Sequence, residues 1–429
     1  MSNIIEKLYG VSKENSSIKI EVLAGLTSFV SISYIIAVNA ALLSTTGMPY
    51  EAVAISTIIC SVVACLLMSF LANSPLILVP GMGDNTFFVF TLVGSFGLSW
   101  QQALAVVLFA GIIFILTSVT KIASRLVETI PQSLISGMSA GIGLFVAFLG
   151  LKNGGIIVAS ESTFVTLGEL NSPVALTTII TLVIILVLYL RNVQGSFLIG
   201  IISGTVIGYF FGIVDTAPLT GGALSLTNFN QVVLAFDFSQ IFTVNFWIAV
   251  FSLSMFTIFQ NMGVQLGMLP DEEKFPKSFL ANGIAVAIAS ALGCCSIASA
   301  AEGAAGVAAG GKTGLTSLVA GLLFIPAIFL LPLFKLIPMS AVSPILMIVG
   351  CLMFSYNIKD IKFKDFTEAF PVYLMLMMMP LSFNIANGIA FGFIFHTLLK
   401  VITGRKLEIS KSVYVISFLF LLYFILGAI

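Results

Sequence analysis

Long apolar stretches separated by short polar segments run through the whole 429-residue sequence. Between Ala52 and Thr120 the single charged residue is Asp84, and between Ala369 and Leu399 there is none. A helix that crosses a membrane needs about 20 consecutive apolar residues. The pattern therefore predicts a chain of membrane-spanning segments with little else between them.

Dividing the apolar stretches at Gly, Pro and polar residues predicts about fourteen spans. Those of the first half are Glu21–Leu43, Ala52–Leu71, Leu76–Val93, Ala103–Val119, Leu134–Leu151, Ala175–Leu190 and Phe197–Ile213. Those of the second half are Trp247–Leu269, Phe279–Leu292, Ile297–Gly311, Leu315–Leu333, Ser343–Phe354, Phe370–Leu381 and Ile385–Ile402. Several are too short to cross alone, which predicts broken elements, and Val413–Leu426 is left as an extra apolar helix.

The composition agrees with a membrane protein and excludes several other classes. Hydrophobic residues make up 59% of the chain and charged residues 8%, against roughly 25% charge in soluble domains. So few charges exclude a cytosolic enzyme, a nucleic-acid binder and a disordered regulator. Neither the cysteines nor the single histidine, His396, has a metal-binding or catalytic spacing. We therefore expect no catalytic residues, metal or cofactor.

The loop charges predict the orientation. With residues 1–20 in the cytoplasm, alternation of the spans places most Lys and Arg residues on the same side, Lys121 and Arg125 among them. Lys152 and Lys335 go against this pattern. Because cytoplasmic loops carry an excess of Lys and Arg, we predict a multi-pass protein of the bacterial cytoplasmic membrane with a cytoplasmic N-terminus.

The third span of each half carries a lone acid among Gly, Pro or small residues. The two acids are Asp84 and Glu302. Two halves of about seven spans have opposite orientations, which is typical of the inverted repeats of secondary transporters. Gly and Pro disfavour a continuous helix. We predict that each of these segments is a short extended stretch followed by a half-helix, whose free N–H groups face a ligand.

The residues near these segments have two interpretations each. An ionised acid within the membrane costs about 2.5–3.5 kcal/mol, which favours a substrate or proton site for Asp84 and Glu302, although either could cap its half-helix. The amides of the eighth span, Gln260, Asn261 and Gln265, could bind substrate or join helices, and Thr257 lies one turn before Gln260 on a similar face. Phe87 could stack on a flat ligand or pack in the core.

Several stretches resemble motifs of bacterial adenine/guanine/hypoxanthine permeases. Val79–Gly83 with Asn85 and Phe87 resembles "APGMGLNAYF", Ala301–Thr316 resembles "ESAAGVAAGGRTGLT", and Met379–Phe393 resembles "MPLTYSIANGIAFGF". The similarity extends from about residue 21 to residue 406. The chain is identified as a member of the nucleobase-cation symporter-2 superfamily, in its purine permease branch.

This resemblance implies an all-α fold of about fourteen segments in two inverted repeats, with a core domain that moves against a gate domain as an elevator. Segments one to four and eight to eleven would form the core, and the others the gate. The implied boundaries are 1–20 for the N-terminus, 21–122 and 241–335 for the core, 123–240 and 336–403 for the gate, and 404–429 for a tail with the extra helix.

The resemblance also implies a substrate site between the third and tenth segments, against the eighth. Glu302 and Gln260 match the two glutamates with which uracil permeases hold the base. The usual "DLFDT" of purine permeases is replaced by Thr257–Asn261, and Asp84 replaces an apolar residue. We expect Asp84 and Glu302 to carry the coupling proton. The expected substrate-binding residues are Glu302, Gln260, Asp84, Gly83, Asn85, Phe87, Gly303 and Thr257.

The functional prediction is proton-coupled import of a nucleobase, in the first place adenine, guanine, hypoxanthine or xanthine. The alternatives are sodium coupling, another small metabolite or an anion on the same fold, a passive channel, and a membrane enzyme. The expected partners are the base, the coupling ion and the lipid bilayer, with a homodimer left open and nucleic acid excluded.

Overall fold

The computed structural model describes residues 2–120, 129–193, 195–214 and 226–427. Within these residues nine helices are long and apolar enough to cross a membrane, and three shorter helices are apolar as well. The predicted domain boundary at residues 122 and 123, and the loop residues Lys121 and Arg125, lie outside the described part of the chain.

The elements of the first half follow the predicted spans closely. They are α1 (Ser2–Tyr9), α2 (Ile18–Ile32), α3 (Ile35–Ser44), α4 (Tyr50–Ala72), β1 (Leu78–Pro80), α5 (Met82–Thr86), a π-helical stretch (Phe87–Ser95), α6 (Trp100–Val119), α8 (Gln132–Asn153), β2 (Ile157–Ser160), β3 (Phe164–Leu167), α9 (Pro173–Leu190) and α10 (Ser196–Phe210). Two features were not predicted. The first span is interrupted between α2 and α3, and β2 and β3 form an antiparallel hairpin.

The second half repeats this order, except that among its described residues no hairpin like β2–β3 follows α16. Its elements are α11 (Val244–Met268), α12 (Phe275–Ala291), β4 (Ile297–Ser299), a short 3-10 turn (Ala301–Gly303), α13 (Ala304–Ala308), α14 (Gly314–Phe324), α15 (Leu331–Phe334), α16 (Met339–Asn357), α17 (Phe366–Leu381), α18 (Ile385–Ile402) and α19 (Lys411–Gly427). The bounds of α18 coincide with those predicted. Helix α17 begins earlier than predicted because Asp365 caps it and accepts a hydrogen bond from the Thr367 N–H at 3.0 Å.

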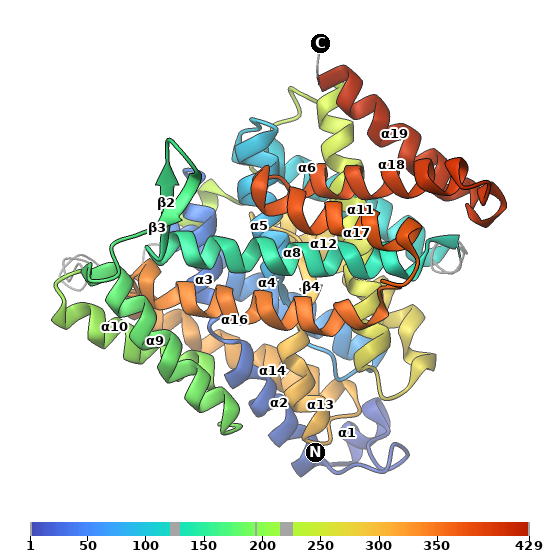
Figure 1. Cartoon of the computed structure of the whole chain (residues 1–429). Helices are drawn as coiled ribbons and strands as arrows, with labels where there is room; N and C mark the ends of the chain where they lie inside the picture. The colour runs from blue at the N-terminus through green and yellow to red at the C-terminus, as the bar shows by residue number, and fades with distance from the viewer. Residues whose placement is uncertain (1, 121–128, 194, 215–225, 428–429) are drawn as a thin grey trace.

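The two broken segments meet inside the molecule. Strands β1 and β4 pair antiparallel, with Val79 opposite Ala298, and all six strand residues are buried. Each strand leads into a short half-helix, α5 after β1 and α13 after β4. Labels α5 and β4 fall near the middle of Figure 1. The prediction of an extended stretch followed by a half-helix is confirmed for both segments.

The helices pack as two groups. In one, α8 lies along α16 and α17 (Figure 1), while α9, α10 and α18 pack on these helices or on one another. In the other, α2, α4, α6, α11, α12 and α14 pack together around β1 and β4. The core and gate domains stay a prediction, and these two packing groups are the feature that supports it.

Helices α8 and α16 approach closely where both carry glycine. A methyl group built on Gly143 would lie 2.6 Å from the carbonyl oxygen of Gly350, and one built on Gly150 would lie 2.7 Å from that of Ser343. Both distances are shorter than a van der Waals contact, so only glycine fits. Small residues allow this close packing between membrane helices.

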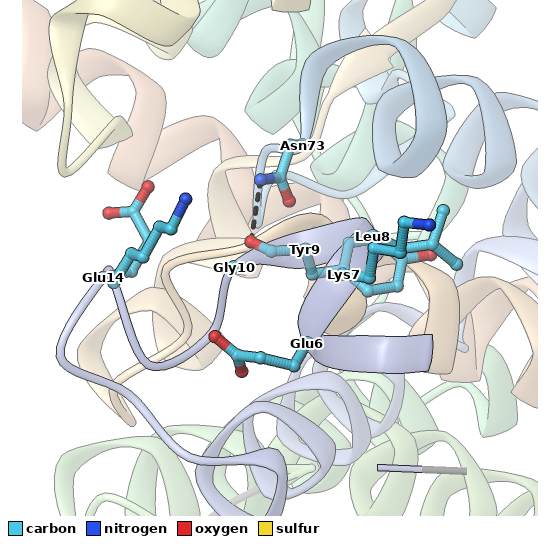
Figure 2. A pocket seen from close by; sticks show the side chains of 8 residues that line it. Glu6, Lys7, Leu8, Tyr9, Gly10, Glu14 and Asn73 are labelled. Carbon is cyan, nitrogen blue, oxygen red and sulfur yellow. Dashed lines mark hydrogen bonds between the residues drawn. The ribbon is translucent and has the colours of Figure 1, made fainter. Parts of the chain in front are cut away.

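The N-terminal segment covers one end of the second packing group. The Asn73 amide donates a hydrogen bond to the Tyr9 carbonyl at 3.0 Å (Figure 2), and the Tyr9 hydroxyl bonds that of Ser69 at 2.9 Å. A hollow of about 620 Å³ lies here, lined by Asn73 and by residues between Glu6 and Glu14. None of these residues belongs to the broken segments or to α11, so this hollow is separate from the predicted site.

Helix α19 packs along the bundle. The Phe420 ring lies 5.4 Å from that of Phe251 on α11 and 6.1 Å from that of Phe393 on α18. The predicted extra apolar helix is therefore present, and it touches one helix of each packing group.

Candidate functional site

Asp84 lies in the first turn of half-helix α5 and is almost fully buried. Its Oδ1 accepts a hydrogen bond from the Thr257 hydroxyl of α11 at 3.3 Å. Its other oxygen, Oδ2, is buried without a hydrogen-bond partner among the described residues. A side chain on Gly81 would collide with this oxygen, so the glycine before the half-helix makes room for the carboxylate. The structure thus brings Asp84 and Thr257 together.

Gly83 faces the eighth span from the other side of the same turn. A methyl group built on it would lie 2.8 Å from Cζ of Phe256 and 3.3 Å from Oε1 of Gln260, both on α11, and 3.3 Å from Ile142 on α8. Within the described part of the chain, the Gln260 side-chain oxygen is buried and has no hydrogen-bond partner. Two unpaired buried oxygens, from Asp84 and Gln260, thus flank one turn of backbone. Unpaired buried polar groups are costly, and here two of them lie beside the same turn of α5.

The other amides of α11 hold strand β4. The Asn261 side chain donates to the Thr257 carbonyl at 2.8 Å and accepts from the Ser299 N–H at 2.8 Å. Gln265 donates to the Ser299 hydroxyl at 2.9 Å. These bonds support the second interpretation of Asn261 and Gln265, in which amide side chains of the eighth span join neighbouring segments. They fix the strand that leads to Glu302.

Glu302 lies in the 3-10 turn before α13 and is half-buried. Its Oε1 accepts a hydrogen bond from the Tyr34 hydroxyl at 2.6 Å. The next residue, Gly303, packs near Ile77, and the Ala300 N–H donates to the Ile77 carbonyl at 3.0 Å. Glu302 is thus the more accessible of the two acids, and a fixed backbone carries it.

Asn85 and Phe87 are engaged inside the protein. Asn85 is fully buried and accepts a hydrogen bond from the Thr86 hydroxyl at 3.3 Å. The Phe87 ring is also fully buried and stacks on Phe256, with ring centroids 5.6 Å apart and planes 5° apart. One face of Phe87 is therefore covered by α11 and is unavailable to a ligand in this conformation.

Sequence reasoning missed three residues of this region. Tyr34 and Phe256 were not singled out, and Ser296, whose hydroxyl lies 3.5 Å from that of Thr257, was not considered. A buried tyrosine at the interruption of the first span carries no signal in the sequence that indicates its partner. Within the described residues no group of three or more His, Cys, Asp or Glu side chains could hold a metal ion.

Two broken segments that pair inside a bundle of spanning helices define an integral membrane transporter with inverted repeats. A solved structure of the same fold is the transmembrane domain of a cyanobacterial bicarbonate transporter, with a TM-score of 0.63 and 18% identity over 86% of this chain and 97% of that one. The murine Solute Carrier 26 family member A9 anion transporter also has a TM-score of 0.63, with 14% identity over 94% of this chain and 72% of that one.

The chain belongs to the Permease family of the nucleobase-cation symporter-2 group, whose family model matches residues 19–391. It is 38% identical to a putative permease of Methanocaldococcus jannaschii, over 98% of each chain. It is 36% identical to a guanine/hypoxanthine permease of Bacillus subtilis, over 96% of this chain and 98% of that one. An adenine permease of Escherichia coli is 34% identical, over 98% and 95%. The family and these relatives are permeases, so the predicted absence of an enzyme activity is confirmed.

Proposed function

We propose that this permease imports a nucleobase, in the first place a purine, by proton symport. The observation that carries the proposal is the pair of broken segments, with Asp84 in the first turn of α5 next to Gly83 and Gln260, and Glu302 in the 3-10 turn before α13. Relatives named for guanine, hypoxanthine and adenine support a purine as the substrate.

The site chemistry suits a neutral, flat heterocycle with N–H donors and carbonyl acceptors. Glu302 would accept the N–H groups of the base, while Gln260, which has both a donor and an acceptor, would pair with its edge. Backbone N–H groups at the start of α5, next to Gly83, and at the start of the turn that contains Gly303 would bind its acceptors. Two acids at the half-helix starts disfavour an anionic substrate, which argues against the anion alternative.

Burial disfavours the charged form of a carboxylate, so a buried acid can take up a proton from the side of higher proton concentration. We propose Asp84 as a proton carrier because its Oδ2 has no protein partner among the described residues. Glu302 is the second proton candidate, and sodium coupling is the alternative outcome.

The two packing groups support an elevator movement. We propose that the group built around β1 and β4 is the core and that the group built on α8 and α16 is the gate. Gly83 contacts α8 near Ile142, so the site lies where the groups meet and could be exposed to either side as the core moves. The N-terminus would be cytoplasmic.

The test is uptake of labelled adenine, guanine, hypoxanthine, xanthine and uracil into liposomes that contain the purified protein. Inward proton and sodium gradients would be applied separately. Glu302→Gln should abolish uptake, and Glu169→Gln, the same change at an exposed residue, is the matched control. Absence of uptake of every base under every gradient would overturn the proposal.

A further inference from the structure

Tyr34 occupies the interruption of the first span. Helix α2 ends at Ile32 and α3 begins at Ile35. Tyr34 directly precedes α3 and is 1% exposed. A tyrosine buried this deeply usually has a partner for its hydroxyl. Its partner here is a residue of the proposed substrate site.

The Tyr34 hydroxyl donates to Oε1 of Glu302 at 2.6 Å. This is the short distance expected for a hydroxyl bonded to a carboxylate. Among the described residues, no other side chain donates a hydrogen bond to this carboxylate. The bond therefore restricts the orientation of Glu302 and occupies one of its two oxygens.

The ring of Tyr34 contacts the other packing group. It meets the Phe197 ring of α10 edge to face, with centroids 5.4 Å apart and planes at 73°. Phe197 in turn stacks on Tyr189 of α9 at 6.0 Å. One side chain thus bonds the site acid through its hydroxyl and packs on the proposed gate through its ring.

We propose that Tyr34 is a positioning residue for Glu302, and that Phe197 holds Tyr34 in place. Tyr34 binds one carboxylate oxygen so that the other is presented to the N–H groups of the base. This inference rests on the proposed function. A movement of the core against the gate changes the contact between Tyr34 and Phe197, so the orientation of Glu302 depends on the transport state.

The test compares uptake kinetics of wild type, Tyr34→Phe and Phe197→Leu in proteoliposomes. Tyr34→Phe keeps the ring and removes only the donor, so KM should rise about tenfold or more, the effect of losing one hydrogen bond to a charged group. The maximal rate should change less than KM. Phe197→Leu keeps the Tyr34 hydroxyl but removes the ring on which Tyr34 packs, so KM should also rise, by a smaller factor.

The matched control is Tyr50→Phe, which removes a hydroxyl that donates to the Phe334 carbonyl at 2.8 Å, outside the site. Its KM should equal that of wild type. If Tyr34→Phe also leaves KM unchanged, the positioning role is overturned while the proposed function stands. If the Tyr34→Phe protein cannot be produced in folded form, Phe197→Leu alone decides the test. An unchanged KM of Phe197→Leu then overturns the proposal. A wild type that takes up no base overturns both inferences.

Discussion

The sharpest test of the proposed coupling is Asp84→Asn. In the folded protein Oδ1 of Asp84 accepts a hydrogen bond from the Thr257 hydroxyl, and Oδ2 has no hydrogen-bond partner in the residues that the structure describes. Asparagine has the same shape, and its amide oxygen can keep the bond from Thr257. The substitution therefore removes the charge and the titratable group without removing a hydrogen bond.

Its effect on stability should be small. The new amide N–H₂ group takes the place of the unpaired oxygen, and leaving a neutral donor unpaired costs about 1–3 kcal/mol. Removing a buried charge that is held by a long hydrogen bond from Thr257 offsets this cost. We expect the free energy of unfolding to change by no more than about 2 kcal/mol, so the variant should fold.

The effect on accumulation should be large. If one proton accompanies each base, every pH unit of gradient supplies about 1.4 kcal/mol, which allows about tenfold accumulation. Wild type under an inward gradient of about two pH units should therefore approach about 100-fold accumulation at zero membrane potential. Asp84→Asn should bring the ratio of internal to external base to about one, because no proton is carried.

The assay is accumulation of labelled base in proteoliposomes, with thermal unfolding measured in parallel. Asp237→Asn is the matched control, because Asp237 is an acid in the loop before α11, where it accepts a hydrogen bond from Gln102 at 2.9 Å. This control should accumulate base like wild type. Wild-type accumulation by folded Asp84→Asn would refute the role of Asp84 as the proton carrier, and a variant that unfolds would assign Asp84 a structural role.

Three further outcomes are expected. Gly83→Ala places a methyl group 2.8 Å from Phe256 and should lower kcat/KM for uptake about tenfold or more. Glu21→Ala removes a fully buried acceptor of two backbone N–H groups and one hydroxyl, so thermal unfolding should show a loss of about 2–4 kcal/mol. Hydrogen bonding from Thr367 holds the pKa of Asp365 below its usual range. The stability that the ionised Asp365 contributes is therefore present above about pH 4 and is lost as the pH falls further. The melting temperature of Asp365→Asn should depend less on pH below that value than the melting temperature of wild type.

Much of the fold could be predicted from the apolar pattern, because a membrane span is a local property of about 20 residues. The bounds of α18 coincide with the prediction, and Gly and Pro next to lone acids indicated both broken segments. The break between α2 and α3 was missed because Ser33 and Tyr34 are neither Gly nor Pro. The π-helical stretch Phe87–Ser95 was missed as well, since its composition is that of an ordinary apolar helix.

The sequence by itself determined the class of protein, the two broken segments and the acids at their half-helix starts. Only the tertiary structure decided which side chains meet these acids. Asp84 and Thr257 are 173 residues apart, and Tyr34 and Glu302 are 268 apart. No periodicity along the chain encodes such contacts, because they depend on the pairing of β1 with β4 and on how α2, α3 and α11 pack around that pair.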